Sequence, residues 1–222
     1  RQWTSLNGSP NLVKALYVDD SSIYAVKHTS IYRSDNSGLT WTQLNLEVDG
    51  LNTVYAKGQN IIAGGEYTYV SEDGGTTWTV PDSTFKMKYV KSIINFKGKI
   101  IAISSGIYES SDNGNTWHEK MDGMHDYPVY SLFLDDDNIF CGTLSGGIYS
   151  SVNNGASWET SNNGIDQKLN ENSEINSIVR SGNNLLAASF GTGIYQSTTN
   201  GDNWTLIGPE NYPAWHSLWR IF

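Results

Sequence analysis

Apolar and polar residues alternate along this chain in segments of strand length, and these segments recur in a fixed order. The first segment of each repeat has a small residue in its third place. These segments are "VKALYV" (13–18), "LNTVYA" (51–56), "VKSIIN" (90–95), "VYSLFL" (129–134), "INSIVR" (175–180) and "WHSLWR" (215–220). Turn residues follow, then a second run such as "IIAGG" (61–65) and a third such as "GIYES" (106–110). This pattern predicts short β-strands joined by hairpins.

The third run of each repeat leads into an eight-residue motif that begins with Ser, has Gly in fifth place and ends with Trp. Its five copies are "SDNSGLTW" (34–41), "SEDGGTTW" (71–78), "SSDNGNTW" (110–117), "SVNNGASW" (151–158) and "STTNGDNW" (197–204). Their serines are 37, 39, 41 and 46 residues apart, which is room for four strands with their turns. A repeat of this length is typical of a β-propeller blade. We therefore expect an all-β fold, with residues 1–222 forming one propeller domain of four-stranded antiparallel blades.

The five motifs resemble Asp-box, or bacterial neuraminidase, repeats, whose pattern is Ser-x-Asp-x-Gly-x-Thr-Trp, and the resemblance covers nearly the whole chain. In that family the box is the hairpin between the third and fourth strands of a blade, which implies a structural role here. The positions that carry the resemblance are Asn36, Gly38, Trp41, Asp73, Gly75, Trp78, Asp112, Gly114, Trp117, Asn153, Gly155, Trp158, Gly201 and Trp204.

The third position of the box departs from the family pattern. It holds Asn36, Asp73, Asp112, Asn153 and Thr199 in the five copies. Asn and Thr could not replace a catalytic or metal-binding carboxylate, but all three residue types offer an oxygen that accepts hydrogen bonds from a turn. We therefore expect these positions to hold their own turns, the following Gly to take a positive φ, and the Trp to pack between sheets.

Composition and charge narrow the classes of partner. The chain has a net charge of −9 and only four Arg residues, without a basic run, so nucleic acid and anionic membrane surfaces are disfavoured. The apolar runs are too short to insert in a bilayer. We expect a secreted or cell-surface bacterial protein whose signal peptide has been removed, and no cofactor. The single cysteine, Cys141, lies in an apolar run and is expected to be buried and structural.

An enzyme is the main alternative, because the resembled family includes sialidases and other glycoside hydrolases such as xyloglucanases. A sialidase-like site would need three converging arginines, and here only Arg180 and Arg220, each at the end of a first run, could face a central channel. A two-carboxylate glycosidase stays open in an acid-rich chain. The segment "LDDDNIF" (134–140) has acids spaced like half of a calcium loop, but it lacks the distal Glu and falls at a predicted hairpin turn. We expect no catalytic residue and no metal site.

We instead expect a non-catalytic binding module for a protein or a glycan. The sequence around the boxes is similar to that of repeat propellers of exported bacterial surface proteins. It is less similar to photosystem II assembly-factor propellers, which use an Arg patch that this chain lacks. Variable loops opposite the boxes are the expected recognition surface. They carry aromatic rings beside polar groups, which suit a protein hot spot or a sugar. The expected binding residues are Glu66, Tyr67, His125, Asp126, Tyr127, Phe190, Tyr212 and Trp215.

The two ends of the chain carry partial repeats. The first six residues, "RQWTSL" (1–6), match the sequence "LTWTQL" (39–44), which is expected to form a fourth strand. The segment "WHSLWR" matches a first strand. Propellers commonly close by joining strands from both ends in one blade, which removes the exposed sheet edges. We expect five complete blades and a sixth that is split between the termini and truncated.

Overall fold

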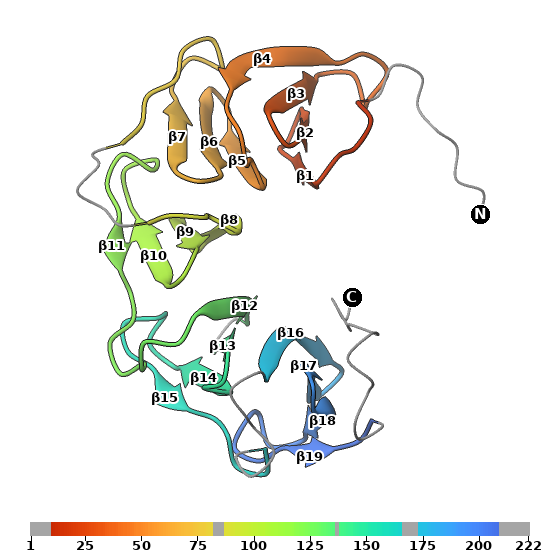
Figure 1. The fold of residues 1–222 in the computed structure, drawn as a ribbon, viewed down its shortest axis with the longest axis vertical. Helices are drawn as coiled ribbons and strands as arrows, with labels where there is room; N and C mark the ends of the chain where they lie inside the picture. The colour runs from red at the N-terminus through yellow and green to blue at the C-terminus, as the bar shows by residue number, and fades with distance from the viewer. Residues whose placement is uncertain (1–9, 82–86, 136–137, 166–172, 209–222) are drawn as a thin grey trace. The chain divides into compact units, whose positions relative to one another are not determined.

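The computed structural model describes residues 10–81, 87–135, 138–165 and 173–208, and these residues form β-strands joined by turns and loops. The strands build five antiparallel sheets that follow one another along the chain (Figure 1). No helix occurs in these ranges, so none of the described segments is a helical membrane span. The predicted all-β class is confirmed.

Strand bounds follow the predicted runs closely. The first sheet contains β1 (Ala15–Val18), β2 (Ile23–Val26), β3 (Ser30–Ser34) and β4 (Thr42–Glu47); the second contains β5 (Thr53–Lys57), β6 (Asn60–Gly64) and β7 (Thr68–Ser71). The third contains β8 (Ser92–Phe96), β9 (Lys99–Ile103), β10 (Ile107–Ser110) and β11 (His118–Glu119). The fourth contains β12 (Val129–Leu134), β13 (Ile139–Thr143), β14 (Ile148–Ser151) and β15 (Glu159–Thr160), and the fifth contains β16 (Glu174–Ser181), β17 (Asn184–Phe190), β18 (Gly193–Ser197) and β19 (Thr205–Leu206).

Strands that are neighbours in the chain are also neighbours in each sheet, so every sheet is an up-and-down meander. The eight-residue motifs, called box turns from here on, join the third and fourth strands in the four sheets that have both. The "LDDDNIF" segment joins β12 to β13, where the Asp135 N–H donates to the Asn138 carbonyl at 2.9 Å. The segment is thus a hairpin turn, as its position in the repeat predicts.

The second sheet departs from the predicted four strands. Its fourth strand is reduced to a single bridge between Val70 and Thr79. Pro81 follows two residues later and has no N–H to donate to a strand ladder. In the other repeats this pairing extends into a fourth strand. Among the described residues of the second repeat it is limited to the one bridge.

The chain divides into two compact units, Arg1–His118 and Glu119–Phe222. The first holds the first three sheets, with the short β11 at its boundary, and the second holds the fourth and fifth sheets. The expectation of one domain over 1–222 stays a prediction, as does the number of blades.

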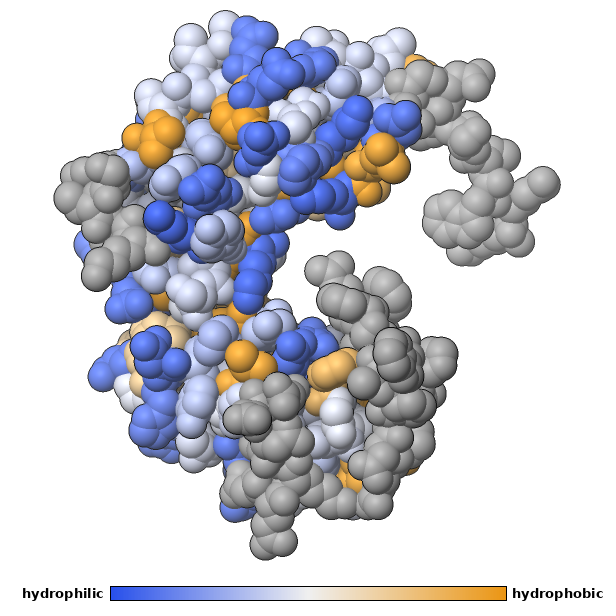
Figure 2. All heavy atoms as spheres, viewed as in Figure 1, coloured by the Kyte–Doolittle hydropathy of each residue, from blue (hydrophilic) through white to orange (hydrophobic). Residues whose placement is uncertain are grey.

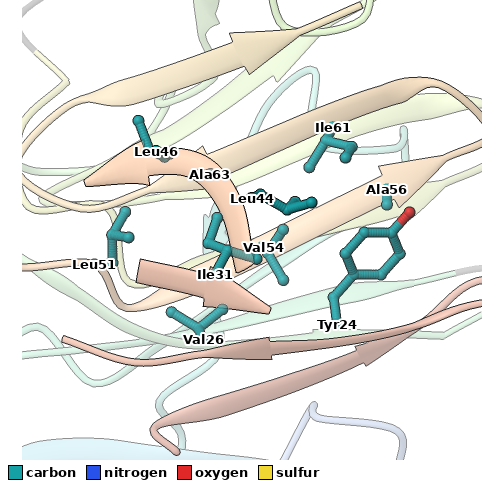
Figure 3. Packing of buried hydrophobic residues seen from close by; sticks show 10 residues of the cluster. All are labelled: Tyr24, Val26, Ile31, Leu44, Leu46, Leu51, Val54, Ala56, Ile61 and Ala63. Carbon is teal, nitrogen blue, oxygen red and sulfur yellow. The ribbon is translucent and has the colours of Figure 1, made fainter. Parts of the chain in front are cut away.

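One core of the first unit lies between the first and second sheets (Figure 3). Side chains of alternate strand positions point into this space, because successive residues of a strand face opposite sides of its sheet. Full burial of one such aliphatic side chain is worth about 1.5–3 kcal/mol. The buried residues of this core are Tyr24, Val26, Ile31, Leu44, Leu46, Leu51, Val54, Ala56, Ile61 and Ala63.

Similar cores lie between the second and third sheets and, in the second unit, between the fourth and fifth sheets. Small residues in the third place of the first strands lie at these junctions. The Ser131 hydroxyl of β12, for example, donates to the Ile175 carbonyl of β16 at 2.8 Å. A larger side chain at this place would separate the two strands.

Candidate functional site

The first serine of each box turn organises the backbone of that turn. Its Oγ accepts the N–H of the Gly four residues later, at 2.8–2.9 Å in all five copies. The two central residues of each turn have positive φ, as in Asn113 (58°) and Gly114 (85°). Asn and Gly tolerate this left-handed backbone better than most residues, which explains their use there.

The residue in the third position of each box accepts the N–H of the residue four places later. The donors and acceptors are Thr40 to Asn36, Thr77 to Asp73, Thr116 to Asp112, Ser157 to Asn153 and Asn203 to Thr199, all at 2.8–2.9 Å. A carboxylate, an amide and a hydroxyl thus perform the same task. The box acids are engaged in holding their turns, and this is the role that the substitutions at this position favour.

The turn bonds also set the acidity of the box carboxylates. Hydrogen bonds from the Thr77 hydroxyl and N–H and from Ser71 lower the pKa of Asp73 to about 2. Burial raises the pKa of Asp112, but hydrogen bonds from Thr116 and Ser110 outweigh it and lower the pKa overall. Both side chains are therefore ionised at neutral pH, a state in which they can accept but not donate hydrogen bonds.

The indole N–H groups of the box tryptophans differ in their partners, and that of Trp117 is buried without a partner among the described residues. In the first two boxes the indole N–H donates within its own turn, from Trp41 to the Gly38 carbonyl and from Trp78 to the Gly75 carbonyl. In the second unit it reaches the preceding segment: Trp158 donates to the Lys120 carbonyl at 3.0 Å, and Trp204 to Ser161 Oγ at 3.4 Å. The expected packing between sheets thus includes a hydrogen bond only in the second unit.

The segment from Lys120 to Pro128, between β11 and β12, is fixed at several points although it is not a strand. Met121–Met124 form a turn with Gly123 at a φ of 83°, and the Trp158 N–H donates to the Asp122 carbonyl at 2.9 Å. A Cβ on Gly123 would lie 2.2 Å from the Trp158 carbonyl oxygen, so only glycine fits. The segment is therefore ordered by its own backbone contacts.

The end of this segment presents polar and aromatic side chains in a fixed geometry. The rings of His125 and Tyr127 meet edge to face at 6.1 Å. The Tyr127 ring also lies against Gly146, where an added Cβ would be 2.3 Å away. The Tyr149 hydroxyl is hydrogen-bonded to the backbone of His125. His125 and Asp126 remain exposed to solvent.

A second group of side chains lies on β12, β16 and β17. Leu144 connects it with the end of the segment, because the Leu144 N–H donates to the Pro128 carbonyl at 2.9 Å and Leu144 forms a strand bridge with Glu174. Tyr130 is 37% exposed, and its hydroxyl is hydrogen-bonded to Glu174. Burial, together with the charge of Glu174, raises the pKa of Tyr130. Phe190 is the strand partner of Glu174 and is partly exposed. We call Tyr130, Glu174 and Phe190, with His125, Asp126 and Tyr127, the loop-end patch.

A further exposed group lies in the first unit, at the hairpin between β6 and β7. Tyr67 is 41% exposed, and the Lys88 ammonium lies 5.9 Å from its ring centroid. The Tyr89 N–H donates to the Glu66 carbonyl at 3.1 Å, which ties the hairpin to the start of the third repeat. Tyr89 is exposed as well and has a φ of 57°.

The sequence-predicted binding residues that the structure describes are divided between the two units. His125, Asp126, Tyr127 and Phe190 belong to one unit, whereas Glu66 and Tyr67 lie in the other. Tyr212 and Trp215 lie outside the described residues. Sequence reasoning missed Tyr130 and Glu174. Tyr130 was detectable, because the second place of the first run otherwise holds Lys14, Asn52, Lys91, Asn176 or His216, all polar, and here holds an aromatic residue.

Two residues considered for chemistry have other roles. Arg180 donates from Nε to Asp135 at 2.9 Å and from Nη2 to Asn200 Oδ1 at 2.7 Å, so its guanidinium is held by neighbouring turns. Cys141 is completely buried, and burial raises the pKa of its thiol. In the described ranges, no three His, Cys, Asp or Glu side chains are grouped so as to hold a metal ion.

No protein-family model and no curated protein matches this sequence. Solved structures do match. The extracellular domain described as that of the hybrid two-component system BT4673 from B. thetaiotaomicron has a TM-score of 0.70 and 16% identity, over 95% of this chain and 30% of that chain. The GH74 xyloglucanase from Xanthomonas campestris has a TM-score of 0.68 and 15% identity, over 92% and 40%.

A third match is YCF48 bound to a D1 peptide, with a TM-score of 0.63 and 17% identity, over 89% of this chain and 69% of that chain. This chain spans well under half the length of the first two structures. Likeness at such low identity shows a shared fold. It does not carry activity, substrates or partners from one protein to the other.

Proposed function

We propose that this chain is a non-catalytic binding module of a secreted or cell-surface β-propeller protein, and that it recognises a protein partner through the loop-end patch. The observation that carries the proposal is the patch itself. It combines partly exposed aromatic rings, two carboxylates and an imidazole on backbone that is already fixed by hydrogen bonds. Aromatic anchors on a preorganised surface are typical of protein hot spots. A glycan is the second candidate, since the same rings could stack on a sugar.

Two of the similar structures support this class of function. One is an extracellular domain, and another is bound to a peptide. Both are properties of those proteins, and they raise the expectation of an exported, protein-binding module here. The face shown in Figure 2 fits this expectation, because its apolar side chains form separate patches among mostly polar residues.

Absence of catalysis is part of the proposal. Asp73 and Asp112 are occupied in their turns, and Arg180 is held by Asp135 and Asn200. We expect the purified chain to hydrolyse neither sialyl, xyloglucan nor aryl-glycoside substrates. Turnover that disappears when a single Asp or Glu is replaced by its amide would contradict this expectation.

The propeller arrangement is also proposed, with a further sheet of the same repeat next to the first sheet. The face of the first sheet that carries Leu16 and Val18 is exposed, whereas the equivalent face of the second sheet packs against a neighbour. The split sixth blade that we expect from residues 1–6 and 215–220 lies outside the described residues.

A photo-crosslinking residue placed at Tyr130 tests the recognition surface in cells that make the protein. We expect a crosslinked partner from position 130 and none from position 39, because Leu39 is more exposed than Tyr130, at 68% against 37%, but lies in a box turn. Binding of the captured partner should weaken about tenfold or more in Tyr130→Ala, as for a hot-spot aromatic, with an unchanged melting temperature. Crosslinking from position 39 alone, or from neither position, would contradict the proposal. A crosslinked glycan would contradict a protein partner and support the second candidate, a glycan partner.

A further inference from the structure

A groove of about 550 Å³ lies in the second unit, between β15 with the segment that follows it and the box turn that joins β18 to β19. It shares no residue with the loop-end patch. Its lining is entirely hydrophilic apart from Gly201. The residues used below are Glu159, Asn163, Asn200, Asp202 and Asn203, all of which are exposed to solvent.

Hydrogen bonds between the two walls fix the groove. The Ser161 hydroxyl donates to the Gly201 carbonyl at 2.6 Å, and the Trp204 N–H donates to the Asn163 carbonyl at 2.8 Å. Beside them, a Cβ on Gly164 would lie 2.0 Å from the Trp204 carbonyl oxygen, so the two backbones are in close contact. A ligand would therefore meet a preformed surface and would not have to order it.

The fifth box turn differs from the other four in a way that frees a side chain for the groove. In the other four turns the seventh residue is Thr or Ser, and its hydroxyl bonds the side chain in third place at 2.6–2.8 Å. In the fifth turn the hydroxyl belongs to the third residue, Thr199, and the seventh is Asn203. The Asn203 amide makes no hydrogen bond within the described residues, although its backbone N–H donates to Thr199.

The unengaged groups of the groove define its ligand. Glu159 and Asp202 offer carboxylates with no ion pair in the described part of the chain, and each can only accept hydrogen bonds when ionised. Asn163 and Asn203 each offer a donor and an acceptor, the complement of a peptide unit. Asn200 Oδ1 is used by Arg180, which leaves its N–H groups. No aromatic ring lines the groove as a platform for a sugar.

From this arrangement we propose a second binding site, which takes an extended peptide segment carrying Lys or Arg. The amides of Asn163 and Asn203 bond the main chain of the peptide, and Asp202 and Glu159 receive its basic side chains. The net charge of −9 favours approach of a cationic segment.

The preceding repeat supplies a matched control for the test. Ala156 and Ser157 occupy in the fourth box the places that Asp202 and Asn203 occupy in the fifth. The double variant Asp202→Ala, Asn203→Ser therefore removes two groove groups by introducing residues that the same turn already tolerates. We expect its urea midpoint to match that of the unmodified chain.

The probe is acetyl-Ala-Lys-Ala-Lys-Ala-amide, titrated into ¹⁵N-labelled protein and followed by NMR. We expect saturable shifts of the amides of 159–163 and 200–203, affinity reduced about tenfold or more in the double variant, and no effect of Tyr130→Ala. The Glu counterpart of the peptide should not bind. Equal affinity in the double variant, or no shift in the groove, would overturn the proposal. Groove shifts caused instead by a xyloglucan oligosaccharide would overturn the peptide class. None of these outcomes bears on the loop-end patch.

Discussion

The first two strands of the first and second repeats pair in the same register, yet their equivalent residues meet different surroundings. Leu16 pairs with Ala25 in the first sheet as Val54 pairs with Ala63 in the second. Leu16 and Val18 are 66% and 67% exposed, whereas their counterparts Val54 and Ala56 are 2% and 1% exposed. The apolar pattern belongs to the repeat, but burial depends on a neighbouring sheet.

The box turns of the same two repeats show the opposite relation. Asn36 and Asp73 differ in charge, yet Ser34 and Ser71 make the same bonds to their turns at 2.9 and 2.8 Å. The serine bonds that shape the turn lie within its eight residues, although the second turn also contacts residues beyond them, as in the Gly74 N–H to Gln59 carbonyl bond at 2.9 Å. Local geometry is thus encoded in each repeat, while the contribution of a strand to stability is set by its neighbours.

The largest expected difference between the two repeats concerns their first strands. Val54→Ala deletes two buried methyl groups, and we expect it to reduce the free energy of unfolding by about 2 kcal/mol. Leu16→Ala deletes more atoms from an exposed position and should change it by less than about 0.5 kcal/mol. Urea unfolding of the two variants, followed by tryptophan fluorescence, measures both values. A cost for Leu16→Ala equal to that for Val54→Ala would mean that a further sheet covers this face in solution.

Removing the first serine of either box should have a smaller effect on stability, and this effect should be the same in the two repeats. Ser34 and Ser71 are buried, and each Oγ accepts the N–H of the following box glycine. Alanine would leave that N–H without its partner, which costs about 1–2 kcal/mol. Ser34→Ala and Ser71→Ala should therefore shift the urea midpoint alike, while the exposed Ser21→Ala leaves it unchanged. Unequal shifts would show that the two turns are not independent of their sheets.

The same distinction explains what the sequence could reveal. Strands and box turns depend on residues close in the chain, so spacing and turn chemistry predicted them; the turn at Asp135–Asn138 is one example. Pro81, two residues after the bridge that replaces a fourth strand, is the sequence signal for that departure. The contact of Tyr130 with Glu174 joins residues 44 positions apart across a long loop, and no local pattern encodes it.

The polar groove shows the same limit. The exchange of Thr199 and Asn203 in the fifth box is visible in the sequence, because the third and seventh places hold residue types that the other copies do not use there. The opposite wall of the groove, which contains Glu159 and Asn163, has no such signal in the sequence. Glu159 and Asn163 reach the groove only because Ser161 and Asn163 bond the fifth sheet.

The smallest expected effect tests the chemical difference between the first two box turns through its dependence on pH. Hydrogen bonds from Thr77 and Ser71 hold the pKa of Asp73 at about 2 in the folded chain, below the ordinary value of about 3.9 for Asp in an unfolded chain. Because the folded state favours the ionised carboxylate, Asp73 stabilises the fold above pH 4, and this contribution is lost as the pH falls towards 2.

Asp73→Asn should remove that dependence with little loss of stability at pH 7. The amide can accept the backbone N–H and donate to the Thr77 hydroxyl, as Asn36 does with Thr40 at 2.8 Å. The urea midpoint of the unmodified chain should therefore exceed that of Asp73→Asn slightly at pH 7, and the difference should vanish or reverse near pH 2. Asn36→Asp is the converse variant. Its stability relative to the unmodified chain should increase as the pH is raised from 2 to 5. A constant difference across this pH range would mean that the Asp73 carboxylate titrates alike in the folded and unfolded chains, and that charge at the third box position does not matter.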